Sequence, residues 1–148
     1  MQSESKATLY NTDYQLWIDA TLQQLHNKEF HQLDLVHLIE EIETMGKSDK
    51  RELQNRLIIL LMYLLKWKYQ SEKQSYSWLS TIDEQRRQIL LIFEDSPSLE
   101  KNYLATVFDK YYQLARKSAC RETQLAIDTF PEICPFSQSE IFDIDFYP

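Results

Sequence analysis

Glycine is almost absent from this chain of 148 residues, since Gly46 is the only one. A typical protein has ~7% glycine, and tight β-hairpins depend on it, most often in Asn-Gly pairs, which do not occur here. A loop that cradles phosphate also needs several glycines, so the sequence excludes a glycine-rich nucleotide-binding loop. The shortage of glycine therefore favours an all-α protein.

Cysteine and histidine are also scarce. Cys120 and Cys134 are the only cysteines and have no histidine nearby, so they make a poor zinc site. All three histidines precede the first arginine, Arg51, which excludes helical nucleases whose motif places an arginine before a histidine. No nucleophile motif is present either. The N-terminus lacks the apolar run of a signal peptide, so we expect a cytoplasmic protein with reduced thiols.

Positive charge is in short supply. The net charge is −7 at pH 7, which repels a phosphate backbone, so we expect no nucleic-acid partner. The longest apolar run is Leu57–Leu65, nine residues interrupted only by Tyr63. A membrane span needs about 17–25 apolar residues, so no membrane association is expected.

The apolar run predicts a buried helix. Its large side chains recur at intervals of three and four residues, which puts them on one helical face. The members of this face are Leu57, Leu60, Leu61, Leu64 and Trp67. The other faces are also apolar, as in a helix packed on several sides. We therefore predict an all-α fold: a compact bundle of about five helices around a long buried central helix over about 48–70.

Local signals place the other elements. Asp34 is expected to cap a helix that ends at Gly46 in a positive-φ conformation, and Ser48 to start the central helix, which would make a helical hairpin. Further helices are expected at about 11–27, 78–94 and 96–123, followed by an irregular tail with two prolines and a capping box, Ser137-x-x-Glu140. We predict a single domain over residues 9–148, with residues 1–8 frayed.

Five ordered motifs carry a resemblance. They are LIEEIETMG (38–46), LLKWKYQ (64–70), SWLSTIDEQRR (77–87), EDSPSL (94–99) and FPEICP (130–135). Together they closely resemble the cyanobacterial family catalogued as domain of unknown function 29. The resemblance covers residues 10–148 and implies a compact all-helical domain from a cyanobacterium or a similar bacterium. It implies no activity.

The acidic cluster on the second predicted helix is the sharpest chemical feature. Glu40 and Glu43 lie three residues apart, so both carboxylates share one helical face that could hold Mg²⁺ or Mn²⁺, with His37 as a further ligand. All-helical nucleotide pyrophosphohydrolases follow such a Glu-x-x-Glu with Glu-x-x-Asp on another helix, and that second half does not occur here. The twofold Glu-x-x-His pattern of di-iron bundles is absent as well.

The same acidic residues are equally consistent with a purely structural role. Lys66 stands at the polar end of the central helix, and Gln85 and Arg86 stand on the helix expected to pack against it. Glu40 or Glu43 could pair with Lys66 or Arg86 across the bundle, where such ion pairs mainly fix the register of packing. A ligand pocket made by these same residues is the second alternative.

Two functions follow from these observations. The first is a small cytoplasmic protein-interaction module without catalysis or cofactor, which binds another protein or a second copy of itself. The absence of catalytic motifs and the excess of apolar and aromatic residues favour it. The alternative is a divalent-metal-dependent hydrolase, acting for example on nucleotides, with Glu40 and Glu43 as ligands and Lys66 or Arg86 on a phosphate.

Overall fold

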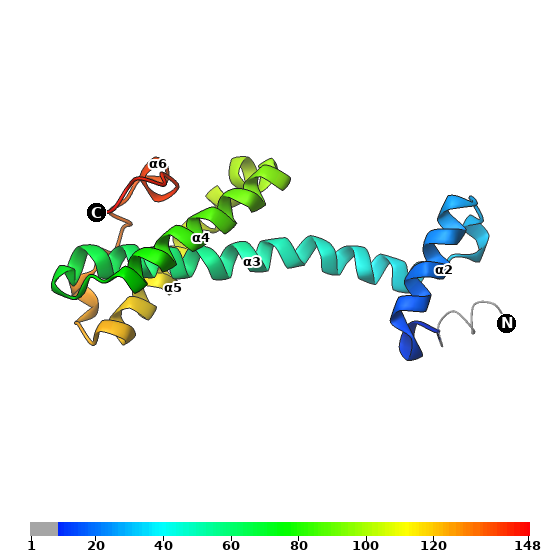
Figure 1. Cartoon of the computed structure of the whole chain (residues 1–148), viewed down its shortest axis with the longest axis horizontal. Coiled ribbons are helices and arrows are strands. Elements are labelled where there is room, and N and C mark those ends of the chain that lie inside the picture. Colours follow the sequence, from blue (N-terminus) through cyan, green and yellow to red (C-terminus); the bar gives the residue numbers. More distant parts are fainter. Residues whose placement is uncertain (1–8) are drawn as a thin grey trace. The chain divides into compact units, whose positions relative to one another are not determined.

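A computed structural model describes residues 9–148, and every regular element in that range is helical (Figure 1). The prediction that residues 1–8 are frayed lies outside the described residues. The chain divides into two compact units, which we call the N-terminal unit (residues up to Ser48) and the C-terminal unit (Asp49–Pro148). The predicted all-α fold with a long central helix is confirmed.

The N-terminal unit holds α2 (Tyr14–His26), the short 3₁₀ helix η1 (Phe30–Gln32) and the first turns of α3. Asp13 caps α2, because its carboxylate accepts a hydrogen bond from the Leu16 amide at 3.1 Å.

The central helix α3 runs without interruption from Leu35 to Tyr69. The predicted break at Gly46 and the start at Ser48 are therefore wrong, as is the helical hairpin between them. Gly46 does not have a positive φ. A glycine inside a helix costs only about 1 kcal/mol, and an established helix propagates cooperatively. The stop and start signals at Gly46 and Ser48 are too weak to end the helix.

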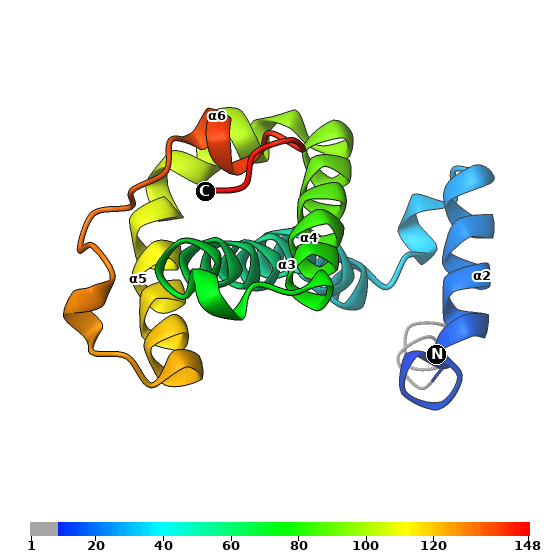
Figure 2. The ribbon, with the colours of Figure 1, turned by 60° about the vertical axis from the view of Figure 1, so that its left-hand side comes forward.

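The C-terminal unit has one hydrophobic core. The second half of α3, α4 (Tyr76–Asp95) and α5 (Leu104–Thr123) pack together (Figures 1 and 2). Between them lie η2 (Ser71–Lys73) and a π-helical turn, η3 (Leu99–Tyr103). The α3 residues in the core include Leu53, Leu57, Leu60, Leu61, Leu64 and Leu65, all fully buried. The prediction that this stretch is buried is confirmed.

The C-terminal segment returns to the bundle. It contains η4 (Ile127–Thr129) and α6 (Gln138–Ile141), and its Phe130, Phe136 and Ile141 enter the core. Ser137 and Glu140 form the predicted capping box, in which each side chain accepts a hydrogen bond from the other residue's amide. The predicted irregular tail is thus confirmed, and its apolar side chains attach it to the core.

Both cysteines are free and partly buried. Within residues 9–148, no helix combines the length and the apolar character that crossing a membrane would require. The single domain over residues 9–148 stays a prediction, since α3 is continuous through the boundary between the two units.

Candidate functional site

The N-terminal unit exposes most of its large apolar side chains. Of the fifteen large apolar side chains that are exposed in residues 9–148, ten lie before Asp49. They are Tyr14, Leu16, Leu22, Leu25, Phe30, Leu35, Val36, Ile39, Ile42 and Met45. Among residues 9–48, only Trp17 and Thr21 are buried. An exposed concentration of this kind is typical of a binding surface, whereas isolated apolar side chains are ordinary on any protein surface.

Four of these side chains form a continuous stripe on α3. Leu35, Ile39, Ile42 and Met45 recur at intervals of three and four residues, which places them on one helical face. Their exposed fractions are 56%, 53%, 58% and 66%. Gly46 follows directly, and a Cβ atom added there would meet nothing within 4 Å. We call these four residues the apolar stripe.

Acidic side chains lie on the same turns of α3 as the apolar stripe. Glu40 and Glu43 are both exposed, and neither has an ion pair within residues 9–148. Residues 9–48 contain seven acidic side chains against two lysines, so this region carries a net charge of −5. The N-terminal unit therefore presents an apolar surface within a negative field.

A third carboxylate on α3, that of Glu41, is engaged inside the unit. The Tyr10 and Tyr14 hydroxyls each donate a hydrogen bond to it at 2.5 Å. These two bonds lower the pKa of Glu41, and the bond to Glu41 raises the pKa of Tyr10 to about 12. His37 stacks on Tyr10 with ring centroids 3.9 Å apart. Sequence reasoning missed this cluster, because Tyr10 and Glu41 are 31 residues apart and no local pattern connects them.

The predicted metal ligands lie together on the first turns of α3, but His37 has another partner. Its Nδ1 atom lies 2.5 Å from the Asp34 Oδ2 atom. No group of three or more His, Cys, Asp or Glu side chains in the described part of the chain is arranged to hold a metal ion. A metal site at Glu40 and Glu43 stays a prediction.

Lys66 and Gln85, two members of the predicted polar cluster, have partners within the C-terminal unit. Lys66 is 6% exposed, and its Nζ atom lies 3.8 Å from a Glu122 carboxylate oxygen and 4.4 Å from the centre of the Tyr63 ring. Gln85 accepts a hydrogen bond from Arg56 at 3.3 Å. The proposed pairing of Glu40 or Glu43 with Lys66 or Arg86 stays a prediction.

Arg86 is fully buried and holds the C-terminal segment. Its Nε donates to the Ile141 carbonyl at 2.8 Å, and its Nη2 donates to the Glu140 carbonyl at 3.4 Å. Its guanidinium lies 5.4 Å from the centre of the Tyr147 ring. Burial lowers the pKa of Arg86. The Nη1 atom is buried and has no hydrogen-bond partner in the described structure.

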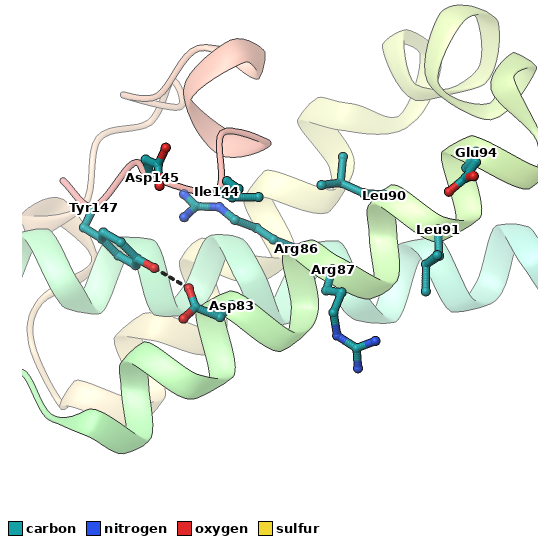
Figure 3. Close-up of a pocket in the computed structure, with 9 residues that line it drawn as sticks. All are labelled: Asp83, Arg86, Arg87, Leu90, Leu91, Glu94, Ile144, Asp145 and Tyr147. Atoms are coloured by element: carbon teal, nitrogen blue, oxygen red, sulfur yellow. Dashed lines mark hydrogen bonds between the residues drawn. The ribbon is translucent and has the colours of Figure 1, made fainter.

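A cavity of about 630 Å³ lies between α4 and the C-terminal segment (Figure 3). Its wall consists of Asp83, Arg86, Arg87, Leu90, Leu91, Glu94, Ile144, Asp145 and Tyr147. The Tyr147 hydroxyl donates a hydrogen bond to Asp83 (Figure 3). Arg86 contributes to this wall although its side chain is fully buried, and its guanidinium already donates to the Ile141 and Glu140 carbonyls. We therefore assign Arg86 to anchoring the tail.

These features define residues 9–148 as an all-helical chain that contains one long helix, with a packed core in the C-terminal unit and exposed apolar side chains in the N-terminal unit. The chain belongs to the family described as Domain of unknown function DUF29, whose model matches residues 9–147. The resemblance noted from the five motifs is thereby confirmed. No curated protein and no solved structure matches the chain.

Proposed function

We propose that this protein is a small protein-interaction module without catalysis, and that it binds its partner through the apolar stripe. The exposure of Leu35, Ile39, Ile42 and Met45 on one face of α3 is the observation that carries the proposal. Removing apolar surface from water contributes roughly 25 cal/mol per Å², so covering these four side chains favours association.

The form of the surface suits a protein partner. Helical anchors at i, i+3, i+4 and i+7 are the usual way in which one amphipathic helix docks on another. The net charge of −5 in residues 9–48 is unsuitable for nucleic acid or for an anionic membrane.

A photo-crosslinking amino acid at position 42 tests this proposal in cells that naturally make the protein. We expect one defined protein adduct, which disappears when Ile39→Ser is added. The matched control carries the crosslinker at Ile133, which is 83% exposed in the C-terminal unit. The same adducts from both positions, or none from position 42, would contradict a dedicated surface at the apolar stripe.

The second candidate is the metal-dependent hydrolase, in which Glu40 and Glu43 bind Mg²⁺ or Mn²⁺. The observation in its favour is that both carboxylates share one exposed helical face and have no ion pair in the described range. A metal that binds only the folded state raises the melting temperature by mass action. The interaction module predicts flat thermal melts across millimolar Mg²⁺ and Mn²⁺, whereas the hydrolase requires an increase that Glu40→Gln and Glu43→Gln remove.

A further inference from the structure

We infer that the apolar stripe binds a positively charged amphipathic helix of another protein. This inference rests on the proposed function and adds the chemistry of the partner. The inference rests on one observation: exposed aliphatic side chains and exposed carboxylates without an ion pair in residues 9–148 lie on the same three turns of α3.

The exposed carboxylates favour a partner whose contact surface is positively charged. Glu43 lies about 40° around the helix from Ile39, at the edge of the apolar stripe, and Glu40 lies about 60° beyond it. Neither carboxylate is neutralised by a base within residues 9–148. The third carboxylate, that of Glu41, is already occupied by Tyr10 and Tyr14. Lysine or arginine side chains that flank an apolar face on the partner would meet Glu43 at the edge of the stripe as the apolar surfaces close, and Glu40 adds to the negative field around them. Such complementarity adds specificity and speeds association.

The dimensions fit a helix. From Leu35 to Met45 the stripe spans about 15 Å at 1.5 Å per residue, which is three turns. A partner helix with leucine or isoleucine at the same intervals can place its side chains between those of α3. The open space at Gly46 lets a partner backbone come close at that end of the stripe.

A second copy of this chain is less suitable as the occupant. Two N-terminal regions would each bring a net charge of −5 to the contact, and like charges that face each other across an interface oppose association. Each copy offers only Lys28 and Lys47 in residues 9–48 to offset that repulsion. A positively charged partner would not be subject to this repulsion.

Designed peptides test the sign directly with the full chain. The probe is an 18-residue amphipathic helix with leucine on one face and lysine on the other, labelled for fluorescence anisotropy. Its matched controls are the same peptide with glutamate in place of lysine, and a peptide of identical composition in scrambled order. The protein variants are Glu40→Gln/Glu43→Gln and Ile39→Ser/Ile42→Ser. The charge control Glu100→Gln/Glu132→Gln removes two exposed acids from the C-terminal unit instead.

We expect the lysine peptide to bind at least 10-fold more tightly than the glutamate and scrambled peptides. Surface charge pairs contribute modestly, so Glu40→Gln/Glu43→Gln should weaken binding about 3- to 10-fold, and salt should weaken it further. Ile39→Ser/Ile42→Ser should reduce binding below detection, while the charge control changes it less than twofold. Light scattering should show a monomer throughout.

The possible failures are distinguishable. If the glutamate and lysine peptides bind the stripe equally, or if the charge control weakens binding as much as Glu40→Gln/Glu43→Gln, the inferred partner charge is wrong while the proposed interaction surface stands. A dimer that Ile39→Ser/Ile42→Ser converts to a monomer would identify a second copy as the occupant and overturn the inference. If no peptide binds, or Ile39→Ser/Ile42→Ser leaves binding intact, the proposed surface itself fails.

Discussion

The two units differ in whether their apolar side chains are buried or exposed. Residues 49–148 bury nineteen of the twenty buried apolar residues in the described chain, and residues 9–48 bury only Trp17. Yet the smaller region holds ten of the fifteen large apolar side chains that are exposed. Charge differs as well: the N-terminal region has a net charge of −5, and the C-terminal unit has thirteen basic against fifteen acidic side chains.

We therefore assign the second half of α3 to the hydrophobic core and its first turns to binding a partner. Aliphatic side chains fill both ends, so amino-acid type alone does not decide which become core. The second half of α3 is covered by α4, α5 and the C-terminal segment. Among residues 9–148, no element covers the apolar stripe in this way, so a partner that buries it would gain the free energy of removing that surface from water. The following variants test this distinction.

Leu61→Ala should have the largest effect. Leu61 is fully buried in the middle of the core, and truncating a leucine in a core typically costs about 2–5 kcal/mol. Urea unfolding followed by circular dichroism measures the loss. Lys68→Ala, an exposed position seven residues further along α3, is the control and should change stability by less than about 0.5 kcal/mol. Equal small losses would mean that the core of the C-terminal unit is misassigned.

Arg86→Leu should cause the second-largest loss of stability. It removes the donors to the Ile141 and Glu140 carbonyls, and leaving a buried acceptor without a partner costs about 1–3 kcal/mol. We also expect faster cleavage of the C-terminal segment by protease. Arg87→Leu is the matched control, because Arg87 is exposed and, within the described residues, pairs only with Glu84. If both variants resist protease equally, Arg86 does not anchor the tail.

Gly46→Ala should stabilise the protein. Gly46 lies inside α3, and a Cβ atom there meets nothing within 4 Å, so replacing glycine should gain about 0.5–1 kcal/mol. Thermal unfolding measures the gain. A loss of stability would indicate a positive φ at position 46, and hence the helix end that the sequence suggested.

The pKa of Glu41 offers a finer test of the N-terminal unit. Hydrogen bonds from Tyr10 and Tyr14 hold it below its ordinary value of 4.5. The contribution of these bonds to folding is therefore present above pH 4.5 and is lost as the pH falls through the lowered pKa. Tyr10→Phe should raise the midpoint of Glu41 in a carbon-detected NMR titration. Unchanged midpoints would exclude the bond from Tyr10.

The sequence predicted the features that depend on local pattern. Spacing along Leu57–Leu64 identified the buried face of α3, and Ser137 and Glu140 identified the last capping box. Local pattern also produced the main error, because Gly46 and Ser48 carry helix stop and start signals that the intact helix overrides.

The candidate site was only partly predictable. Glu40 and Glu43 stood out as an exposed acidic pair, but nothing in the sequence distinguishes Ile42, which is exposed, from Leu61, which is buried. That distinction depends on which elements pack against each turn of α3. The contacts between Tyr10 and Glu41, and between Arg86 and Ile141, join residues 31 and 55 positions apart, beyond the reach of any periodic pattern.

The free energy of unfolding of Ile42→Ala, measured beside that of Leu61→Ala, tests the central claim most directly. Both changes truncate an aliphatic side chain on α3, but Ile42 is 58% exposed and Leu61 is fully buried. Urea melts should show a loss below about 0.5 kcal/mol for Ile42→Ala against about 2–5 kcal/mol for Leu61→Ala. If Ile42→Ala costs as much as Leu61→Ala in the isolated monomer, the apolar stripe is already covered within the chain, and it is not a surface held open for a partner.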